Sequence, residues 1–452
     1  MKNPVALAVL SAVLQSAAAE EAYDVCVVGG GAAGIAAALQ SGRSGAKTLL
    51  VERASQVGGN MTTGGVNWPG LFHAWGRQVI DGCGWELVTN CVALADGTLP
   101  DFSSDPGRLH WKHQVRVSIP LFVALAEEKL SAAGVEIRYQ TAPSRAERRD
   151  GRWNLSLAAD GEAQEVSAAV LVDATGNGTL SALCGGRRMR DPGACQPGAF
   201  TYLMNPYARS ADLDFRTIDE LHRKAVAEGR LEKSDIARGV RFLVDESNAM
   251  LDRFAGGPDH GTTIANYIAG ADNSTAGLRT RTNMRGRASM LRTYRFLRSL
   301  PGLEKTSIVW MSPEVGVRET WRVEGDAVLT GADYAAGRVF PDAVCHSFYP
   351  IDIHTVEEGV RPRHLERGTV PTVPLGALVV RGVDGVLVAG RCISTDRFAN
   401  SAVRVQATCM ATGQVAGEAA ALAARLGGDV RKVPLDRLRD RLRASGAIVP
   451  AR

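Results

Sequence analysis

The chain has 452 residues, of which 45% are hydrophobic and 22% are charged, and its formal net charge at pH 7 is +4. This length and composition allow a substantial core, and they predict about two or three domains rather than a disordered chain. Because the net charge is small for the length, the sequence indicates no nucleic-acid partner.

Residues 1–19 have the pattern of a signal peptide. Lys2 is followed by an apolar run over residues 5–14, which is too short to span a bilayer, and alanines at 17–19 suit cleavage before Glu20. We therefore expect a secreted or periplasmic protein, with a frayed apolar N-terminus or a weak membrane anchor as the alternative. No other stretch has the apolar length of a membrane span, so no integral membrane segment is expected.

The next stretch has the pattern of a dinucleotide-binding βαβ unit. A strand predicted over residues 23–28 runs into the turn GGGAAG at 29–34, an alanine-rich helix follows, and a second strand over 48–51 ends at Glu52. Strand, glycines, helix, strand and terminal acid together are a far more specific signal than three glycines alone.

Each glycine of this motif has its own physical role, and so does the acid that ends the second strand. Gly29 permits the tight turn, Gly31 lets a pyrophosphate approach the backbone at the helix N-terminus, and Gly34 allows close packing of helix on strand. The acid at the end of the second strand would accept hydrogen bonds from an adenosine ribose. The residues expected to contact the cofactor in this unit are Gly29, Gly31, Ala33, Gly34 and Glu52.

A second glycine-rich loop follows the ribose-binding acid directly, which NAD dehydrogenases do not usually have. It reads RASQVGG over residues 53–59 and continues as NMTTGG to residue 65. With this loop the chain resembles the glutathione-reductase-like superfamily of flavoproteins, and more narrowly the bacterial FAD-dependent oxidoreductase family that shares its architecture with fumarate-reductase-type proteins. The resemblance implies an FAD cofactor, with contacts from Arg53, Gly58, Gly59 and Asn60.

Two distant segments carry the same resemblance. VLVDATG at 170–176 and GVLVAGR at 385–391 are strands that run into glycine turns, and an alanine-rich helix is expected from about Ser401. Its N-terminus would direct a positive dipole at the flavin. The further cofactor contacts that the resemblance implies are Ala174, Gly176, Gly390, Arg391, Ser401 and Val403. Because the 58–65 loop contains no His or Cys, we expect noncovalent FAD.

These anchors predict an α/β fold: a Rossmann-like FAD-binding domain with a parallel sheet and a β-ribbon, plus an inserted α+β substrate domain. The FAD-binding domain is expected to comprise residues 20–72, 115–195 and 375–428. The substrate or cap region is expected to comprise residues 73–114 and 196–374. A basic tail, residues 429–452, follows and is expected to contain a solvated helix.

The eight cysteines indicate neither a metal site nor a redox motif. No CxxC pair is present, so neither a zinc ribbon nor a thioredoxin-like pair is expected, and we predict no metal centre. Cys83 with Cys91, or Cys184 with Cys195, could close a short disulfide loop in an oxidising compartment.

An arginine-rich stretch spans residues 279–298. Ala288, Leu291 and Leu297 recur among its seven arginines at helical spacing, which favours a helix with one apolar face and a basic solvent face. An acidic substrate or the acidic surface of a partner stays open as an alternative.

Two charged segments are candidates for catalysis. The first is GVRETWR at 316–322, which contains Arg318 and Glu319, and the second is FYPIDIH at 348–354. Segments that match these in the resembling family carry similar residues near the substrate face.

The second segment contains Tyr349, Asp352 and His354. An Asp that orients a His is a usual way to build a general base, although a buried Asp–His pair can also serve only to join domains. The resemblance places a His where this chain has Asn400, which makes His354 the leading proton acceptor. Arg404 matches the family and would neutralise reduced flavin or hold a substrate carboxylate.

The sequence thus predicts an FAD-dependent dehydrogenase or reductase that acts on a small polar organic molecule by hydride transfer. GNG at 176–178 lacks the third glycine of a second dinucleotide fingerprint, so electrons are expected to exchange with an external donor or acceptor such as oxygen, a quinone or a small redox protein. The alternatives are a flavoprotein with non-redox chemistry, such as a hydratase or isomerase, and an FAD-binding protein without turnover.

Overall fold

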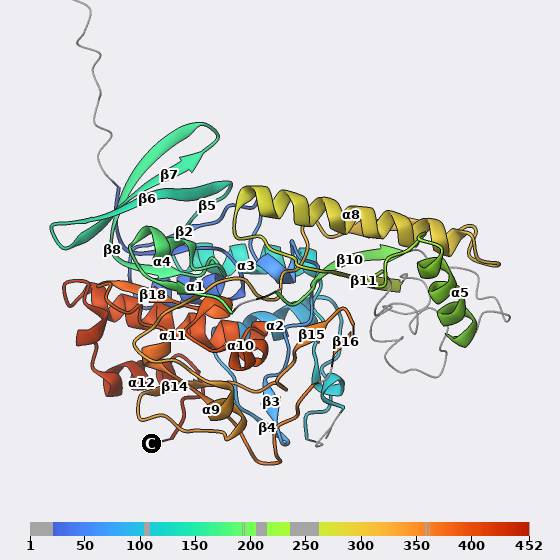
Figure 1. Ribbon diagram of the computed structural model, residues 1–452. Coiled ribbons are helices and arrows are strands. Elements are labelled where there is room, and N and C mark those ends of the chain that lie inside the picture. The colour runs from blue at the N-terminus through green and yellow to red at the C-terminus, as the bar shows by residue number, and fades with distance from the viewer. Residues whose placement is uncertain are drawn as a thin grey trace, which may run out of the picture.

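The computed structural model describes residues 21–103, 109–191, 193, 195–204, 215–235, 262–357, 359–360 and 362–451 (Figure 1). The predicted signal peptide, residues 1–19, lies outside the described residues. Within the described part of the chain, no helix is both long and apolar enough to cross a membrane.

A seven-stranded sheet forms the centre of the molecule, with strand order β5-β2-β1-β8-β7-β6 and with β18 paired to β8. Its strands are β1 (Glu21–Val28), β2 (Thr48–Val51), β5 (Glu136–Arg138), β6 (Thr141–Arg149), β7 (Arg152–Ala159), β8 (Glu162–Asp173) and β18 (Val386–Val388). Strands β5, β2, β1, β8 and β18 pair in parallel, whereas β6 and β7 pair antiparallel. The predicted α/β class, with a parallel sheet and a β-ribbon, is confirmed.

The β-ribbon turns at two Asp-Gly pairs, a sequence typical of tight turns. Asp150 and Gly151 connect β6 to β7, and Asp160 and Gly161 connect β7 to β8. All four have positive φ, between 44° and 88°, which Asp tolerates and Gly adopts freely.

The helices of the main body are α1 (Ala32–Arg43), α2 (Cys83–Leu94), α3 (Ile119–Ala132), α4 (Thr179–Leu183), α10 (Arg397–Val403), α11 (Gln406–Ala424) and α12 (Leu435–Ala444). Small residues explain how closely α1 and α11 approach. A Cβ at Gly413 would lie 2.1 Å from the Ala33 carbonyl oxygen, and one at Gly417 would lie 2.2 Å from that of Ala37. The two backbones therefore touch, and α11 is held against the glycine turn.

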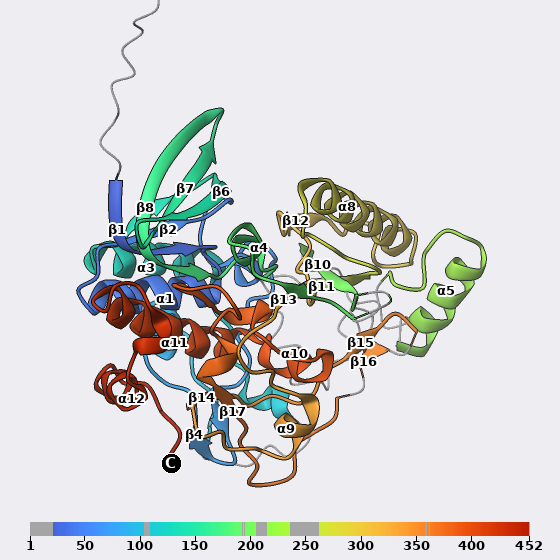
Figure 2. The same cartoon turned by 60° about the vertical axis from the view of Figure 1, so that its left-hand side comes forward.

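A second core lies in the cap, which Figure 2 shows beside the main body. Its elements are β10 (Gly198–Met204), β11 (Thr262–Ile268), β12 (Ile308–Met311), α5 (Phe215–Ala227) and α8 (Ala276–Arg298). The sheet has the order β11-β10-β12, and α8 packs on it through Phe296 and Leu297. We use the name cap for residues 196–317.

The other segments predicted for the substrate region pack into the main core instead. These are β3 (His73–Ala74), β4 (Arg77–Gln78), β13 (Arg322–Val323), α9 (Gly331–Ala335), β14 (Ala343–His346), β15 (His354–Thr355), β16 (Gly359–Val360) and β17 (Thr372–Pro374). Strand β9 (Arg188–Met189), from the predicted FAD-binding domain, pairs with β13. Leu87, Tyr334 and Val373, for example, are buried in the same cluster as the strands of the large sheet.

Two local expectations are wrong, and a third is only partly confirmed. All eight cysteines are free, so neither candidate disulfide forms. The tail helix α12 is docked rather than solvated, because Leu438 and Leu442 are fully buried and Arg439 donates to the Ala343 carbonyl at 2.8 and 3.0 Å. The arginine-rich stretch forms the predicted helix, α8, but of the predicted apolar face Leu297 is buried whereas Leu291 is exposed. The helix also packs through Gly286, where Phe200 fills the space that a side chain would need.

Candidate active site

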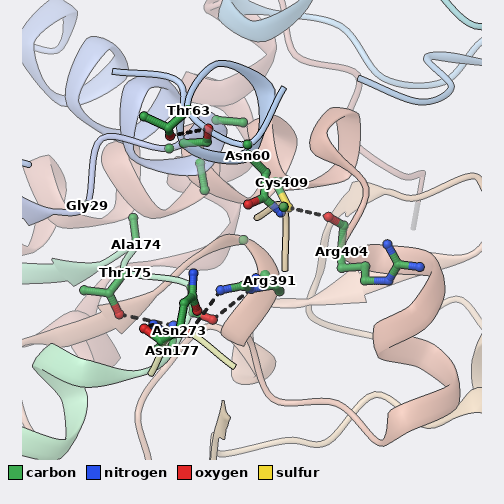
Figure 3. A pocket seen from close by; sticks show the side chains of 18 of the residues that line it. Gly29, Asn60, Thr63, Ala174, Thr175, Asn177, Asn273, Arg391, Arg404 and Cys409 are labelled. Carbon is green, nitrogen blue, oxygen red and sulfur yellow. Dashed lines mark hydrogen bonds between the residues drawn. The ribbon is translucent and has the colours of Figure 1, made fainter. Parts of the chain in front are cut away.

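The glycine turns and the predicted catalytic segment line one cavity of about 490 Å³ (Figure 3). The predicted cofactor contacts that line it are Gly29, Gly31, Ala33, Glu52, Arg53, Gly58, Gly59, Asn60, Ala174, Gly176, Gly390 and Arg391. The predicted catalytic residues that line it are Arg318, Tyr349, Asp352, His354 and Arg404. Gly34, Ser401, Val403 and Glu319 are not among its lining residues.

Two of the three motif glycines are required by close contacts with neighbouring backbone, whereas the third faces open space. A Cβ at Gly29, where φ is +102°, would lie 2.5 Å from the Ala174 carbonyl oxygen, and one at Gly34 would lie 1.7 Å from that of Gly29. A Cβ at Gly31 would meet nothing within 4 Å. Gly31 is also the N-cap of α1, so the space in front of it is a cradle for an anionic group.

Glu52 is held at the end of β2 by two backbone amides. Its carboxylate accepts hydrogen bonds from Gly30 N at 2.5 Å and from Ala54 N at 2.7 Å, and only 8% of the residue is exposed. The charge therefore has a fixed position in the cavity wall, as ribose binding requires.

Arg391 brings a partly buried positive charge to the cavity. Its guanidinium donates to the Gly176 and Val317 carbonyls and, at 3.0 Å, to Asn177 Oδ1, so its partners in the described structure are neutral oxygens. Burial lowers the pKa of Arg391. A partly buried guanidinium with no carboxylate partner is suited to an anionic ligand.

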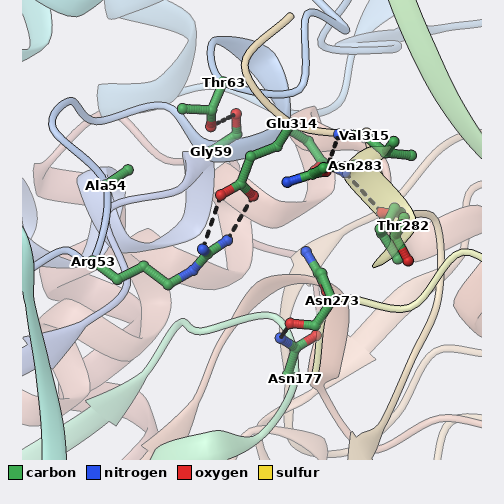
Figure 4. A network of polar contacts seen from close by, with 12 residues as sticks. Arg53, Ala54, Gly59, Thr63, Asn177, Asn273, Thr282, Asn283, Glu314 and Val315 are labelled. Atoms are coloured by element: carbon green, nitrogen blue, oxygen red, sulfur yellow. Dashed lines mark hydrogen bonds and ion pairs between the residues drawn. The ribbon is translucent and has the colours of Figure 1, made fainter. Parts of the chain in front are cut away.

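An ion pair at this cavity joins the cap to the FAD-binding domain. Arg53, which follows the ribose-binding acid, makes a bidentate contact with Glu314 at 2.9 and 3.0 Å (Figure 4). Glu314 N donates to the Thr63 carbonyl at 3.0 Å. Two glycine-loop residues of the FAD-binding domain are thus joined to one residue of the cap.

His354 is connected on both sides of its ring. Nε2 lies 2.7 Å from Asp352 Oδ2, and Nδ1 lies 2.8 Å from the Tyr267 hydroxyl. The Arg318 guanidinium lies 5.1 Å from the centre of the Tyr267 ring. His354 is 3% exposed, and its backbone N donates to Gln196 Oε1 at 3.0 Å. His354 therefore has one fixed orientation.

Glu319 supports this arrangement from outside the cavity. Its carboxylate accepts from Gln196 N and Nε2, both at 2.8 Å, and pairs with Arg397 at 2.9 Å. Because Gln196 also binds the backbone of His354, Glu319 positions the histidine rather than contacting a ligand. This differs from the expected catalytic role.

The C-terminal helix begins later than expected. Helix α10 ends at Val403, the chain is extended at Val405, and α11 starts at Gln406, so Ser401 lies within the short preceding helix. Arg404, at this break, donates to the Asp352 carbonyl at 3.0 Å and lies 3.5 Å from Oδ2 of the same residue. The break, not the start of α10, faces the cavity.

Asn400, where the resemblance places a histidine, is fully buried and donates to the Arg391 carbonyl at 2.8 Å. It does not line the cavity, so its contact positions Arg391.

Sequence reasoning missed several lining or supporting residues. Tyr267, Gln196 and Asn273 come from the cap and belong to no motif of the sequence. Arg279 opens the arginine-rich stretch, for which the sequence favoured a basic solvent face rather than a place in the cavity. Cys409 also lines the cavity, and it lies far in sequence from the 58–65 loop. Burial raises the pKa of its thiol to about 12, so it is protonated at neutral pH and unreactive.

The fold and the cavity define a dinucleotide-binding flavoprotein with a capped site. Residues 24–442 match the sequence profile of the FAD dependent oxidoreductase family. The chain belongs to this family, and it is an FAD-dependent oxidoreductase.

Comparison with solved structures gives distant similarities. A geranylgeranyl bacteriochlorophyll reductase-like protein of Thermoplasma acidophilum is 12% identical with a TM-score of 0.43, and the match covers 94% of this chain and 84% of that one. The p-nitrophenol 4-monooxygenase PnpA of Pseudomonas putida is 13% identical with a TM-score of 0.39, covering 94% and 89%. The myxobacterial chondrochloren halogenase CndH is 13% identical with a TM-score of 0.41, covering 94% and 79%.

At these identities the likenesses identify no substrate. Among curated protein sequences no significant match was found.

The residues present fit FAD. The open space at Gly31, the fixed carboxylate of Glu52 and the partly buried guanidinium of Arg391 lie along one cavity and suit a pyrophosphate, a ribose and a further anionic group. When bound, FAD supplies a two-electron acceptor or donor.

Proposed function

We propose that the protein transfers a hydride between a small polar organic molecule and FAD. Asp352, oriented by His354, exchanges the accompanying proton with the substrate. One observation carries this proposal: the Asp352–His354–Tyr267 chain of hydrogen bonds reaches the same cavity that the cofactor-binding turns line. The resemblance to the glutathione-reductase-like flavoproteins supports the same assignment. It is carried by the glycine turn at 29–34 and by the second glycine-rich loop, which ends at residue 65.

The hydrogen bonds divide the roles of the two residues. Both ring nitrogens of His354 already have partners, so we assign direct proton exchange with the substrate to the Asp352 carboxylate, which lines the cavity. In the oxidative direction the substrate loses a hydride from carbon, and the proton of its hydroxyl or amine passes to Asp352. His354 orients that carboxylate, and Tyr267 holds the histidine ring.

The test measures reduction of the flavin under anaerobic conditions. Candidate substrates are first identified by dye reduction with sugars, hydroxy acids and amino acids. Asp352→Asn should keep FAD and slow flavin bleaching by roughly 10²–10⁴-fold, the usual contribution of a general base. His354→Gln should give a smaller loss, because it removes orientation but leaves the carboxylate.

His346→Gln is the matched control, since His346 is half-buried and does not line the cavity. Bleaching of Asp352→Asn at the wild-type rate would remove Asp352 from proton transfer. Product formation with no change in flavin absorbance would instead favour the non-redox alternative.

We also propose that residues 1–19 are a cleaved signal peptide and that the mature protein is secreted or periplasmic. The positive Lys2, the short apolar run and the small residues before Glu20 support this proposal. The intact mass of protein isolated from its native source tests it: a mature chain that starts at Glu20 is expected, and a retained Lys2 contradicts cleavage.

A further inference from the structure

Helix α8 has two opposite faces, one buried and one exposed along its whole length. The buried face consists of Thr282, Gly286, Ser289, Thr293 and Phe296. The exposed face, which we call the α8 stripe, consists of Gly277, Arg281, Met284, Ala288, Leu291, Arg295 and Arg298. In both sets the spacing alternates between three and four residues, so each forms one straight row. Figures 1 and 2 show α8 along the outer edge of the cap, with no other described element over it.

The α8 stripe carries positive charge that the described chain leaves uncompensated. The helix has seven arginines and no Asp or Glu. Arg281 and Arg295, on the stripe, and the exposed Arg285 beside it make no hydrogen bond or ion pair in the described part of the chain. Arg298 donates to a neutral group, the Glu304 carbonyl, at 2.7 Å. The stripe is therefore complementary to an anionic surface.

The centre of the stripe is apolar. Met284 is 59% exposed and Leu291 is 43% exposed, and they lie two turns apart on the same side of the helix, with Ala288 between them. Arg281 and Arg295 lie on either side of this apolar centre. Such a row is typical of helices that lie on anionic membranes, where basic side chains contact headgroup phosphates and apolar side chains enter the boundary with the acyl chains.

We propose that the α8 stripe docks on an anionic lipid surface. Two copies of this chain would bring arginine against arginine through this face whichever way the helices ran, because Arg281 and Arg295 stand at both ends of the apolar centre. A protein partner would need a groove shaped to one convex helix, whereas a planar bilayer needs only the opposite charge.

Docking through α8 has a consequence for the cavity. Thr275, Ala276 and Arg279, at the start of α8, line the cofactor cavity, so the docked cap brings one side of that cavity next to the lipid surface. The inference concerns where the protein binds and is independent of the proposed hydride transfer.

The experiment measures co-sedimentation of the FAD-loaded full chain with phosphatidylcholine vesicles, with and without phosphatidylglycerol, at low and high salt. The double variant Arg281→Gln/Arg285→Gln is compared with Arg437→Gln/Arg443→Gln, which removes the same charge from exposed positions of α12. Helix α12 lies far from α8 in both views of the molecule (Figures 1 and 2). Leu291→Gln tests the apolar centre, and soluble poly-glutamate serves as a probe for an acidic protein.

Wild-type protein should bind vesicles that contain phosphatidylglycerol at low salt and bind them less at high salt. Arg281→Gln/Arg285→Gln should weaken this binding by roughly 10- to 30-fold, at about fivefold for each arginine near an anionic surface. The α12 double variant should stay within about twofold of wild type, because its charges do not face the lipid. Leu291→Gln should weaken binding by about three- to tenfold and keep the salt dependence, since it removes apolar contact but no charge.

Equal binding of the two double variants to anionic vesicles would overturn the proposal, because only the total charge would then matter. All variants keep residues 1–19, so binding through that apolar segment would also leave the two equal. FAD content and unfolding temperature should match wild type in each variant, since the altered side chains are exposed. Poly-glutamate binding that requires Arg281 and Arg285, without any binding to anionic vesicles, would assign the stripe to an acidic protein and would contradict lipid docking.

Discussion

Helices α1 and α8 both begin at the cofactor cavity, but they are built in opposite ways. Helix α1 is rich in alanine and nearly all of its residues are buried, whereas α8 carries seven arginines and buries mainly small or polar residues. The first helix starts at Gly31, whose missing side chain makes the space for a ligand. The second starts at Thr275, an ordinary N-cap.

The difference shows that only one of the two helix starts at this cavity leaves a motif in the sequence. A close backbone approach demands glycine at fixed spacing, and that demand leaves a pattern in the sequence. A helix N-terminus that approaches through amides and a long side chain tolerates many residue types, so it leaves none. The arginines of α8 therefore favoured a basic solvent face, with an acidic substrate or an acidic partner surface as the alternative.

The largest expected effect comes from filling the space at the start of α1. Gly31→Val should weaken FAD binding by at least about 2–3 kcal/mol, or ~100-fold, because its side chain would occupy the cradle. The fold should persist, since a Cβ there meets nothing within 4 Å. FAD titration and thermal unfolding of the apoprotein measure the two properties separately.

Gly34→Ala is the contrasting variant. Its Cβ would lie 1.7 Å from the Gly29 carbonyl oxygen, so it should lower the unfolding temperature of the apoprotein, which Gly31→Val should not. Full FAD occupancy in Gly31→Val would show that the cofactor does not approach this turn.

A smaller effect is expected on the cap side, from the contact that joins Glu314 to Arg53. The two side chains are 22% and 37% exposed, so the ion pair should be worth about 0.2–1 kcal/mol. Glu314→Gln should therefore speed FAD dissociation about 1.5- to 5-fold, with the greatest difference from wild type at low salt. Stopped-flow recovery of FAD fluorescence measures this rate, and an unchanged rate at low salt would exclude the pair as a closure of the cap.

Prediction from sequence succeeded where backbone geometry dictates residue type. The strands at 23–28 and 48–51, the Asp-Gly turns of the ribbon and the Asp352–His354 contact all follow from such local rules. Long-range partners carry no local signal, so the Tyr267 hydroxyl on Nδ1 of His354 was not foreseen. For the same reason, docking of the tail helix was missed: Arg441 pairs with the buried Glu418, 23 residues away in sequence.

The last prediction concerns the stability of the core around His73 and not the binding of the cofactor. His73 stacks on Phe102 with ring centres 3.8 Å apart, and its Nδ1 is buried without a partner in the described structure. Burial, followed by the charge of His113, lowers the pKa of His73 from the ordinary value of 6.5 to about 4.

Because the folded state holds this pKa below its unfolded value, the unfolded chain binds more protons in the window between pH 6.5 and 4. The stability that neutral His73 provides is therefore present above pH 6.5 and is lost as the pH falls toward 4. His73→Phe keeps the stacking and removes the titration, so between pH 7.5 and 5 it should lose about 1–2 kcal/mol less unfolding free energy than wild type. Urea unfolding of both apoproteins at the two pH values measures this difference. Parallel losses in the two proteins would show that His73 titrates as freely in the fold as in the unfolded chain.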